Sequence, residues 1–309
     1  MAILDVGDLN TTQIRALDRS RTVVLFVGGM LEEHGPYLPA FTDGILSARL
    51  ADEVARTIAS QKADWTVLRF PTIGFGASGS NEIGGQFTFP GTFVVRPSTL
   101  RAVFMDLAGE IGDQGFRWAF VVHVHGSPMH IRALDDAGDY FNDTYGGRMV
   151  NLWGLVPVLA GWGNALAILS DEERREDGAS LHGGLDEHSM MLYLRPDLVA
   201  AGYKTAAPVT GRTAADAFEA AKQGGWPGYI GSPRRASAAM GERIWKGFSA
   251  AAGEQAVKIL DGADPSAIQR YADLLFRNPV YQDGWIKPAT ARDEARGAAH
   301  REWLSRRRP

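Results

Sequence analysis

Short apolar runs alternate with segments of helical periodicity along the first half of the chain. Residues 23–27 form a continuous β-branched and apolar run, which is typical of a strand buried on both faces. Residues 65–70 and 116–122 repeat this pattern, and each of the three runs is followed by a segment with helical spacing. These helices are expected to begin at Asp43, at Ser98 as the capping residue, and near Met129.

The later part of the chain carries weaker patterns. A further strand is predicted at residues 149–155, and residues 206–240 are rich in Gly, Ala and Pro and should be irregular apart from a helix near 214–221. Two more helices are predicted at 242–260 and 265–276.

Strands that alternate with helices predict an α/β fold with three layers, in which helices cover both faces of a mostly parallel sheet. Ligand sites in such sheets gather at the carboxyl ends of the strands. Neither an internal repeat nor an interdomain linker is visible, so residues 1–309 are predicted to form a single domain, with 252–309 as a helical and irregular C-terminal extension.

Composition narrows the possible chemistry. The net charge of −4 argues against a nucleic-acid partner. The absence of cysteine excludes thiolate ligands and cysteine nucleophiles, so a bound metal must be held by nitrogen and oxygen, as suits zinc, manganese or iron. The sequence shows neither a secretory signal pattern nor an apolar run of membrane-spanning length, so a cytoplasmic protein without a membrane partner is expected.

Six of the seven histidines fall in three short windows: His34; His123, His125 and His130; His182 and His188. The first two windows directly follow predicted strands, where loops from separate βα units converge. The clustering therefore indicates a site rather than scattered packing roles.

The first two windows together supply a ligand set. Glu32 and His34 can point in one direction in an extended segment, and Asp43 lies where the next helix is expected to start. Taken singly, Asp43 is most simply a helix cap, Glu32 a surface residue and His125 a structural histidine. Taken together they form a set of two carboxylates and two imidazoles that suits a divalent metal.

Residues 181–189 form the third window. His182 is a candidate general acid or base, and Glu187 a candidate ligand or base. For Asp186 and His188 the preferred interpretation is helix-start chemistry, because acidic side chains favour the first turn of a helix.

Three further residues are candidate substrate contacts. Residues 74–80 fit neither the dinucleotide nor the P-loop fingerprint, so this Gly-rich loop is expected to line the substrate pocket, with Ser78 as a contact. His123, in the second window, and Trp226, which belongs either to the core or to the pocket wall, complete this group.

The first window resembles the signature of the creatininase family, Gly-Ser-x-Glu-x-His-Gly-Pro-His-Leu-Pro…Thr-Asp. It has Glu32-Glu33-His34-Gly35-Pro36, then Leu38-Pro39 and Thr42-Asp43. Four later blocks, at 89–92, 115–126, 182–189 and 228–241, are similar to further blocks of this family and occur in the same order.

The resemblance implies a hydrolase with one or two metal ions that acts mostly on amide bonds, and a homo-oligomer, since family members are commonly hexamers. By position, the implied metal ligands are Glu32, His34, Asp43 and His125, with Asp43 able to bridge two ions. His182 would handle protons near the substrate, and Glu187 would be a ligand or an acid behind the ligands.

One departure concerns the second metal. Creatininases carry a glutamate ligand where this chain has Ser127, so either Glu187 completes the second site or only one metal binds. His123 also replaces the family's usual asparagine, and creatinine itself is therefore a poor candidate substrate.

The resulting prediction is a metal-dependent hydrolase in which metal-activated water attacks a carbonyl of a small cyclic substrate, most simply the C–N bond of an amide or lactam. Two alternatives stay open. One is hydrolytic carbon–carbon cleavage of a cyclic diketone such as an oxidised inositol, and the other is a metal-stabilised binding protein without activity.

Overall fold

A five-stranded sheet forms the centre of the molecule. In the computed structural model, which describes residues 2–307, all strand pairs are parallel and the order is β1-β3-β2-β4-β5. The strands are β1 (Ala2–Asp5), β2 (Thr22–Val27), β3 (Thr66–Arg69), β4 (Trp118–Val122) and β5 (Arg148–Asn151). Every residue of β2 is buried, as expected for a central parallel strand covered on both faces.

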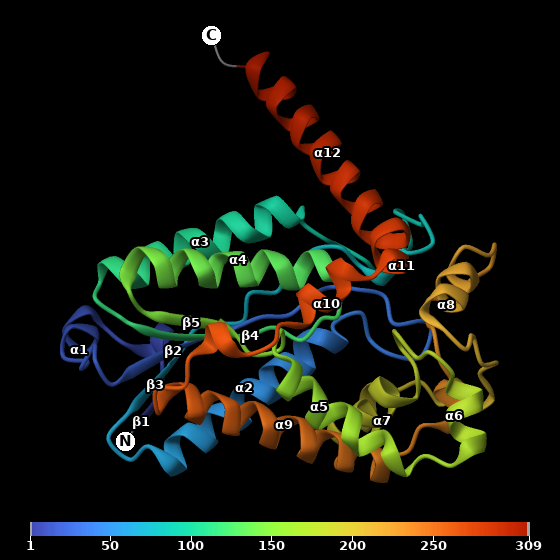
Figure 1. Cartoon of the computed structure of the whole chain (residues 1–309), viewed down its shortest axis with the longest axis horizontal. Coiled ribbons are helices and arrows are strands. Elements are labelled where there is room, and N and C mark those ends of the chain that lie inside the picture. The colour runs from blue at the N-terminus through green and yellow to red at the C-terminus, as the bar shows by residue number, and fades with distance from the viewer. Residues whose placement is uncertain (1, 308–309) are drawn as a thin grey trace.

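Helices cover both faces of the sheet, which confirms the predicted three-layer α/β fold (Figure 1). One face carries α3 (Pro97–Asp113) and α4 (Pro128–Tyr145). The other face carries α2 (Thr42–Gln61), α5 (Val156–Ala165) and α9 (Ala238–Leu260), and α7 (Leu185–Leu194) packs beside α9.

Strand register brings the first two histidine windows together. Val27 pairs with Val122, and the amide of Gly28 donates to the Val122 carbonyl at 2.9 Å, so the loops after β2 and β4 leave the sheet side by side. The helices that follow these two strands, α2 and α4, pack on opposite faces. The chain therefore opens a crevice between the ends of β2 and β4, the position where α/β sheets bind ligands.

Two predicted elements are shorter than expected. The strand predicted at 149–155 ends at Asn151, because the following residues turn with amide-to-carbonyl bonds from Gly154 to Asn151 and from Leu155 to Leu152. The helix predicted at 265–276 is split into a 3-10 turn at Pro265–Ala267 and α10 at Tyr271–Arg277. The intervening residues pair instead with the start of α5 and the residue before it, since Val156 donates to the Gln269 carbonyl and Leu155 forms a β-bridge with Arg270.

Two helix starts also differ from prediction. Ser98 does not cap α3; Arg96 is the N-cap, and both the amide and the hydroxyl of Ser98 donate to the carboxylate of Asp293, at 3.0 and 2.7 Å. Helix α9 begins before residue 242 because the Ser237 hydroxyl accepts from the Met240 amide. This helix runs unbroken past residue 252, and the C-terminal extension stays a prediction.

The remaining elements are short, apart from the last helix. They are α1 (Thr11–Arg15), α6 (Asp171–Asp177), the predicted α8 (Ala214–Ala221), α11 (Pro279–Tyr281), a π-helix (Gln282–Ile286), α12 (Lys287–Ser305), and 3-10 turns at Val6–Asp8, Ser80–Glu82, Leu166–Ile168, Pro196–Leu198, Ala201–Thr205 and Pro233–Arg235. Helix α12 projects away from the body of the molecule (Figure 1). Within residues 2–307, no helix has both the length and the apolar character needed to cross a bilayer. The single-domain organisation stays a prediction.

Candidate metal centre

Five predicted metal ligands meet at the crevice between β2 and β4. Glu32 and His34 lie on the loop after β2, and Asp43 lies in the first turn of α2. His125 follows β4, and Glu187 comes from the first turn of α7. The side chains of the first four are at least 96% buried, and that of Glu187 is 14% exposed.

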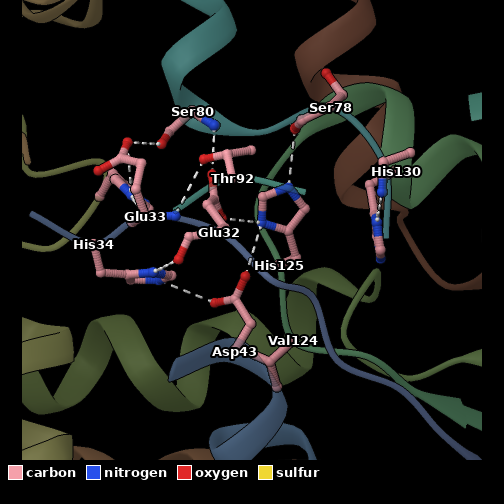
Figure 2. A network of polar contacts seen from close by, with 12 residues as sticks. Glu32, Glu33, His34, Asp43, Ser78, Ser80, Thr92, Val124, His125 and His130 are labelled. Atoms are coloured by element: carbon pink, nitrogen blue, oxygen red, sulfur yellow. Dashed lines mark hydrogen bonds and ion pairs between the residues drawn. The ribbon is translucent and has the colours of Figure 1, made fainter. Parts of the chain in front are cut away.

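These side chains form two groups of three that share Asp43. In the first group, Nδ1 of His125 lies 3.0 Å from Oε2 of Glu32 and 3.2 Å from Oδ2 of Asp43. In the second, Nε2 of His34 lies 3.2 Å from Oδ1 of Asp43 and 3.9 Å from Oε1 of Glu187. Figure 2 shows the Asp43 carboxylate between the two imidazoles, with one oxygen directed to each. Each group could hold a divalent cation, and Asp43 belongs to both.

The two imidazoles are oriented by backbone carbonyls on their far sides. Nε2 of His125 faces the Ser78 carbonyl at 3.0 Å, and Nδ1 of His34 faces the Glu32 carbonyl at 3.0 Å (Figure 2). A ring nitrogen that donates to a carbonyl leaves the other nitrogen with a free lone pair, directed here toward the shared Asp43. This outer hydrogen bond is the usual support of a histidine that binds metal.

The converging atoms fit a metal ion better than they fit one another. Oε2 of Glu32, Nε2 of His34 and Oδ2 of Asp43 are buried and lack a hydrogen-bond partner within residues 2–307. Ligands about 2.0–2.2 Å from a tetrahedral ion are roughly 3.4 Å apart. The separations of 3.0–3.9 Å within the two groups bracket that value. A donor set of carboxylates and imidazoles suits zinc, manganese or iron.

The pKa shifts within the cluster also favour a bound cation. Burial would raise the pKa of Asp43, but His34 and His125 hold it well below its usual range. Burial and the neighbouring His182 disfavour protonation of His34, yet Asp43 and Glu187 outweigh them and raise its pKa to about 9. Without a cation, the cluster therefore retains protons on its imidazoles. A bound divalent ion would replace these protons, because metal ligands must be deprotonated.

His182 faces the same cluster from the third histidine window. Its ring lies 4.3 Å from the ring of His34, and its Nε2 contacts both the backbone carbonyl and, at 3.5 Å, the Oε1 atom of Glu33. Burial disfavours protonation of His182, but Glu32 and Glu33 outweigh it and raise the pKa to about 10. His182 therefore lies at the cavity wall with an imidazole that favours its protonated form.

Glu33 is the residue that the sequence pattern undervalued. It is only 4% exposed, and its carboxylate accepts from the Gly35 amide at 3.1 Å and the Ser80 hydroxyl at 3.2 Å, besides facing His182. Nothing in the local spacing distinguishes it from a surface glutamate. Its burial results from long-range packing of the loops that surround the site.

Ser127, where creatininases carry a glutamate, belongs to neither donor group. Ser127 is the N-cap residue of α4, and it lies at the cavity with its hydroxyl lacking a partner in the described chain. Glu187 reaches the second donor group from α7 instead, held by the Gly183 amide, which donates to its Oε2. Gly183 adopts a φ of +56°, a conformation that side chains other than glycine rarely take.

The three predicted substrate contacts lie elsewhere. The Ser78 hydroxyl donates to Glu82 at 2.7 Å and accepts from Trp285 at 2.9 Å. His123 is fully buried beneath the site, where it accepts from the Gly29 amide and contacts His130. Trp226 is a core residue whose indole donates to a backbone carbonyl. Because none of these three side chains lines the cavity, the geometry does not support their predicted role.

Asp186 and His188 largely follow their predicted structural roles. Both lie in the first turns of α7, and His188 is fully buried with its Nδ1 against the Gly184 carbonyl. Asp186 also reaches the cavity wall, where it accepts from the indole of Trp162 at 3.0 Å.

A cavity of about 290 Å³ opens beside the donor cluster, and Asp43, His125, His182 and Glu187 line its polar end. This volume suits a small molecule or the end of a longer one.

Comparison with known proteins decides the family. The family described as creatinine amidohydrolase, or creatininase, matches residues 7–256. The chain belongs to the creatininase family. It is therefore a hydrolase, and the alternative of a binding protein without activity is set aside.

Two individual relatives of this chain share less than a third of their residues with it. A mycofactocin precursor peptide peptidase of Mycolicibacterium smegmatis is 31% identical over 248 residues, covering 77% of this chain and 85% of that protein. A creatinine amidohydrolase of Pseudomonas putida is 26% identical, covering 63% of this chain and 73% of that protein.

A crystal structure of creatinine amidohydrolase superimposes with a TM-score of 0.62 at 23% identity, covering 84% of this chain and 98% of that one. Solved creatininases of similar likeness include a mutant described as Zn-Zn type and one described as creatininase Mn. At this identity the likeness supports the creatininase fold.

Proposed function

We propose that this chain is a metal-dependent amidohydrolase that cleaves a C–N amide bond with two divalent ions. The observation that carries the proposal is the pair of buried donor groups that share Asp43 at the polar end of the cavity. Glu32, Asp43 and His125 would hold one ion, and His34, Asp43 and Glu187 the other. A divalent ion bound there lowers the pKa of coordinated water and polarises a carbonyl.

The chain's own residues supply orientation and protons. The Ser78 carbonyl fixes the ring of His125, and the backbone carbonyl of Glu32 fixes that of His34. His182, at the cavity wall, is placed to donate a proton to the departing amine nitrogen. The carboxylate of Glu33, which faces His182, favours the protonated imidazole that this step requires.

The cavity walls favour an amide substrate over an oxidised inositol. Trp153, Leu159, Trp162 and Leu181 give the walls an apolar part, against which the hydroxyl groups of a polyol ring would be buried without hydrogen-bond partners. The peptidase name of the relative with 31% identity extends the candidate class from small cyclic amides to peptides. A cytoplasmic, homo-oligomeric enzyme stays a prediction.

Metal content and turnover measured together test the proposal. Wild type loaded with zinc or manganese is expected to bind two ions and to hydrolyse an amide in a screen of peptides, lactams and inosose-type ketones. His125→Ala should lose metal and turnover together, because it removes a donor that touches Glu32 and Asp43. His300→Ala, on the exposed part of α12, is the matched control. Full metal content and activity in His125→Ala would refute the assignment.

A further inference from the structure

The cavity beside the metal centre has a strongly aromatic wall. Besides the donor residues, five aromatic side chains line it: Trp153, Trp162, Tyr271, Tyr281 and Trp285. Rings in such a cage pack against a flat apolar group through offset or edge-to-face contacts, beyond the gain from burial alone. A creatinine-sized polar substrate would leave most of this surface without a partner.

Three of the five rings come from a segment that follows the part of the chain matched by the family. The match ends at residue 256, whereas Tyr271 lies in α10, Tyr281 in α11 and Trp285 in the π-helix. We define the pocket segment as residues 271–285. Its rings are largely buried, at 7% exposure for Tyr281 and 6% for Trp285, so the segment is packed against the site.

The pocket segment is attached to the loop that supports the metal centre. The indole of Trp285 donates to the Ser78 hydroxyl, which in turn donates to Glu82. Arg292, in the first half of α12, extends this series of hydrogen bonds by donating to Glu82 at 2.7 Å. Ser78 also presents its backbone carbonyl to His125. The aromatic wall and a candidate metal ligand therefore share one anchor residue.

Tyr271 and Tyr281 also offer polar groups to a ligand. In the structure of residues 2–307, neither phenol hydroxyl forms a hydrogen bond with another protein group, although Tyr281 is 7% exposed. Phe218 contacts the Tyr281 ring edge-on at 5.2 Å and holds it in place. A rigid aromatic ring with a free hydroxyl is a common element of small-molecule recognition.

We propose that the pocket segment selects substrates by enclosing a bulky apolar or aromatic group next to the scissile amide. The position of the amide rests on the proposed function, whereas the aromatic pocket does not. A phenyl-sized group stacked on these rings gains about three- to tenfold in affinity per aromatic partner.

Kinetics on matched peptides test the selectivity. The metal-loaded enzyme is assayed on Ala-Ala-Ala and on the three tripeptides with one Phe. Wild type should prefer Phe at one position by about tenfold in kcat/KM, mainly through KM. Tyr281→Ala should reduce this preference about three- to tenfold, while Trp303→Ala, 54% exposed on α12, should leave it unchanged. Tyr271→Ala, on the same wall, serves if Tyr281→Ala does not fold.

A binding measurement separates this inference from the proposed function. Calorimetry compares N-acetyl-phenylalaninamide with N-acetyl-alaninamide on metal-loaded His182→Ala, and on His182→Ala combined with Tyr281→Ala. A preference for the phenyl compound that the second substitution weakens supports the pocket, even if wild type cleaves no amide. Amide cleavage without any phenyl preference, or an unchanged preference in Tyr281→Ala, would overturn the inference and leave the hydrolase intact.

Discussion

Replacing Glu187 by Gln tests whether α7 supplies the ligand that the family glutamate supplies elsewhere. Gln has nearly the same size and still offers an oxygen to the Gly183 amide, which now donates to Oε2 of Glu187. With that oxygen on Gly183, the other end of the side chain is an NH2 group, so the substitution removes both the negative charge and the donor oxygen that lies 3.9 Å from His34. The first donor group, Glu32, Asp43 and His125, does not contain Glu187 and should be unaffected.

The size of the effect follows from counting donors. The second group falls from three strong donors to two, one of which is the shared Asp43. Changing a residue that only hydrogen-bonds to a metal ligand costs about 10- to 100-fold in metal affinity. Losing a donor that touches the metal itself should therefore cost at least about 100-fold. That loss equals about 2.7 kcal/mol of binding free energy. The stoichiometry in dilute metal should fall from two ions per chain to one.

Elemental analysis measures the stoichiometry after stripping with a chelator and reloading with zinc. The same samples are assayed for amide hydrolysis, where kcat should fall with the second ion. Asp186→Asn is the matched control, because it changes a neighbouring acid that lines the cavity but belongs to neither donor group. If Glu187→Gln retains two ions and full activity, or if wild type binds only one, Glu187 is not the second-site ligand.

Three further predictions concern stability. Ser78→Ala leaves the Trp285 indole without its acceptor and should lower the free energy of unfolding by about 1–3 kcal/mol in urea denaturation, whereas an unchanged midpoint would contradict the anchor role. Phe104→Ala removes a fully buried ring and should cost about 3–5 kcal/mol, against a negligible change for exposed Phe93→Ala in the same experiment. Burial raises the pKa of Asp135 to about 7. The unfolded chain therefore loses this proton first as pH rises from about 4 to 7, and wild type loses stability in that window. Asp135→Asn should remove up to about 4 kcal/mol of this pH dependence in thermal and urea melts at pH 4 and pH 8, and parallel curves for both proteins would refute it.

The layered fold is predictable because its strands and helices follow from local patterns of apolar and polar residues. The run at 23–27 is apolar at every position and becomes the fully buried β2, and the helical spacing after Asp43 becomes α2. Errors occur where tertiary pairing overrides local preference. Residues 268–270 have no local reason to interrupt a helix, and they do so because the neighbouring backbone pairs with residues 154–156.

That the candidate ligands come together is predictable for a related reason. Its donors follow strand ends, and parallel strands bring their carboxyl ends to one edge of the sheet. The role of Ser78 is harder to predict from the sequence. Its loop does reach the site, but the side chain is turned toward Glu82 and the carbonyl toward His125. Ser78 is the one residue other than glycine in the described chain with a positive φ, +61°, and no sequence spacing encodes that orientation.

The candidate catalytic residues and the proposed selectivity residues lie in different parts of the sequence. All the candidate ligands and His182 lie within residues 32–187, inside the part that matches the family, while Tyr271, Tyr281 and Trp285 lie after it. Changes in the later segment can alter the cavity wall without replacing a ligand. The two parts of the site are not fully independent, because Trp285 and His125 both bind Ser78. A substitution that shifts Ser78 should therefore affect metal affinity and substrate preference together. Tyr281 is not among the residues that hydrogen-bond Ser78 within residues 2–307, so its substitution should affect preference alone.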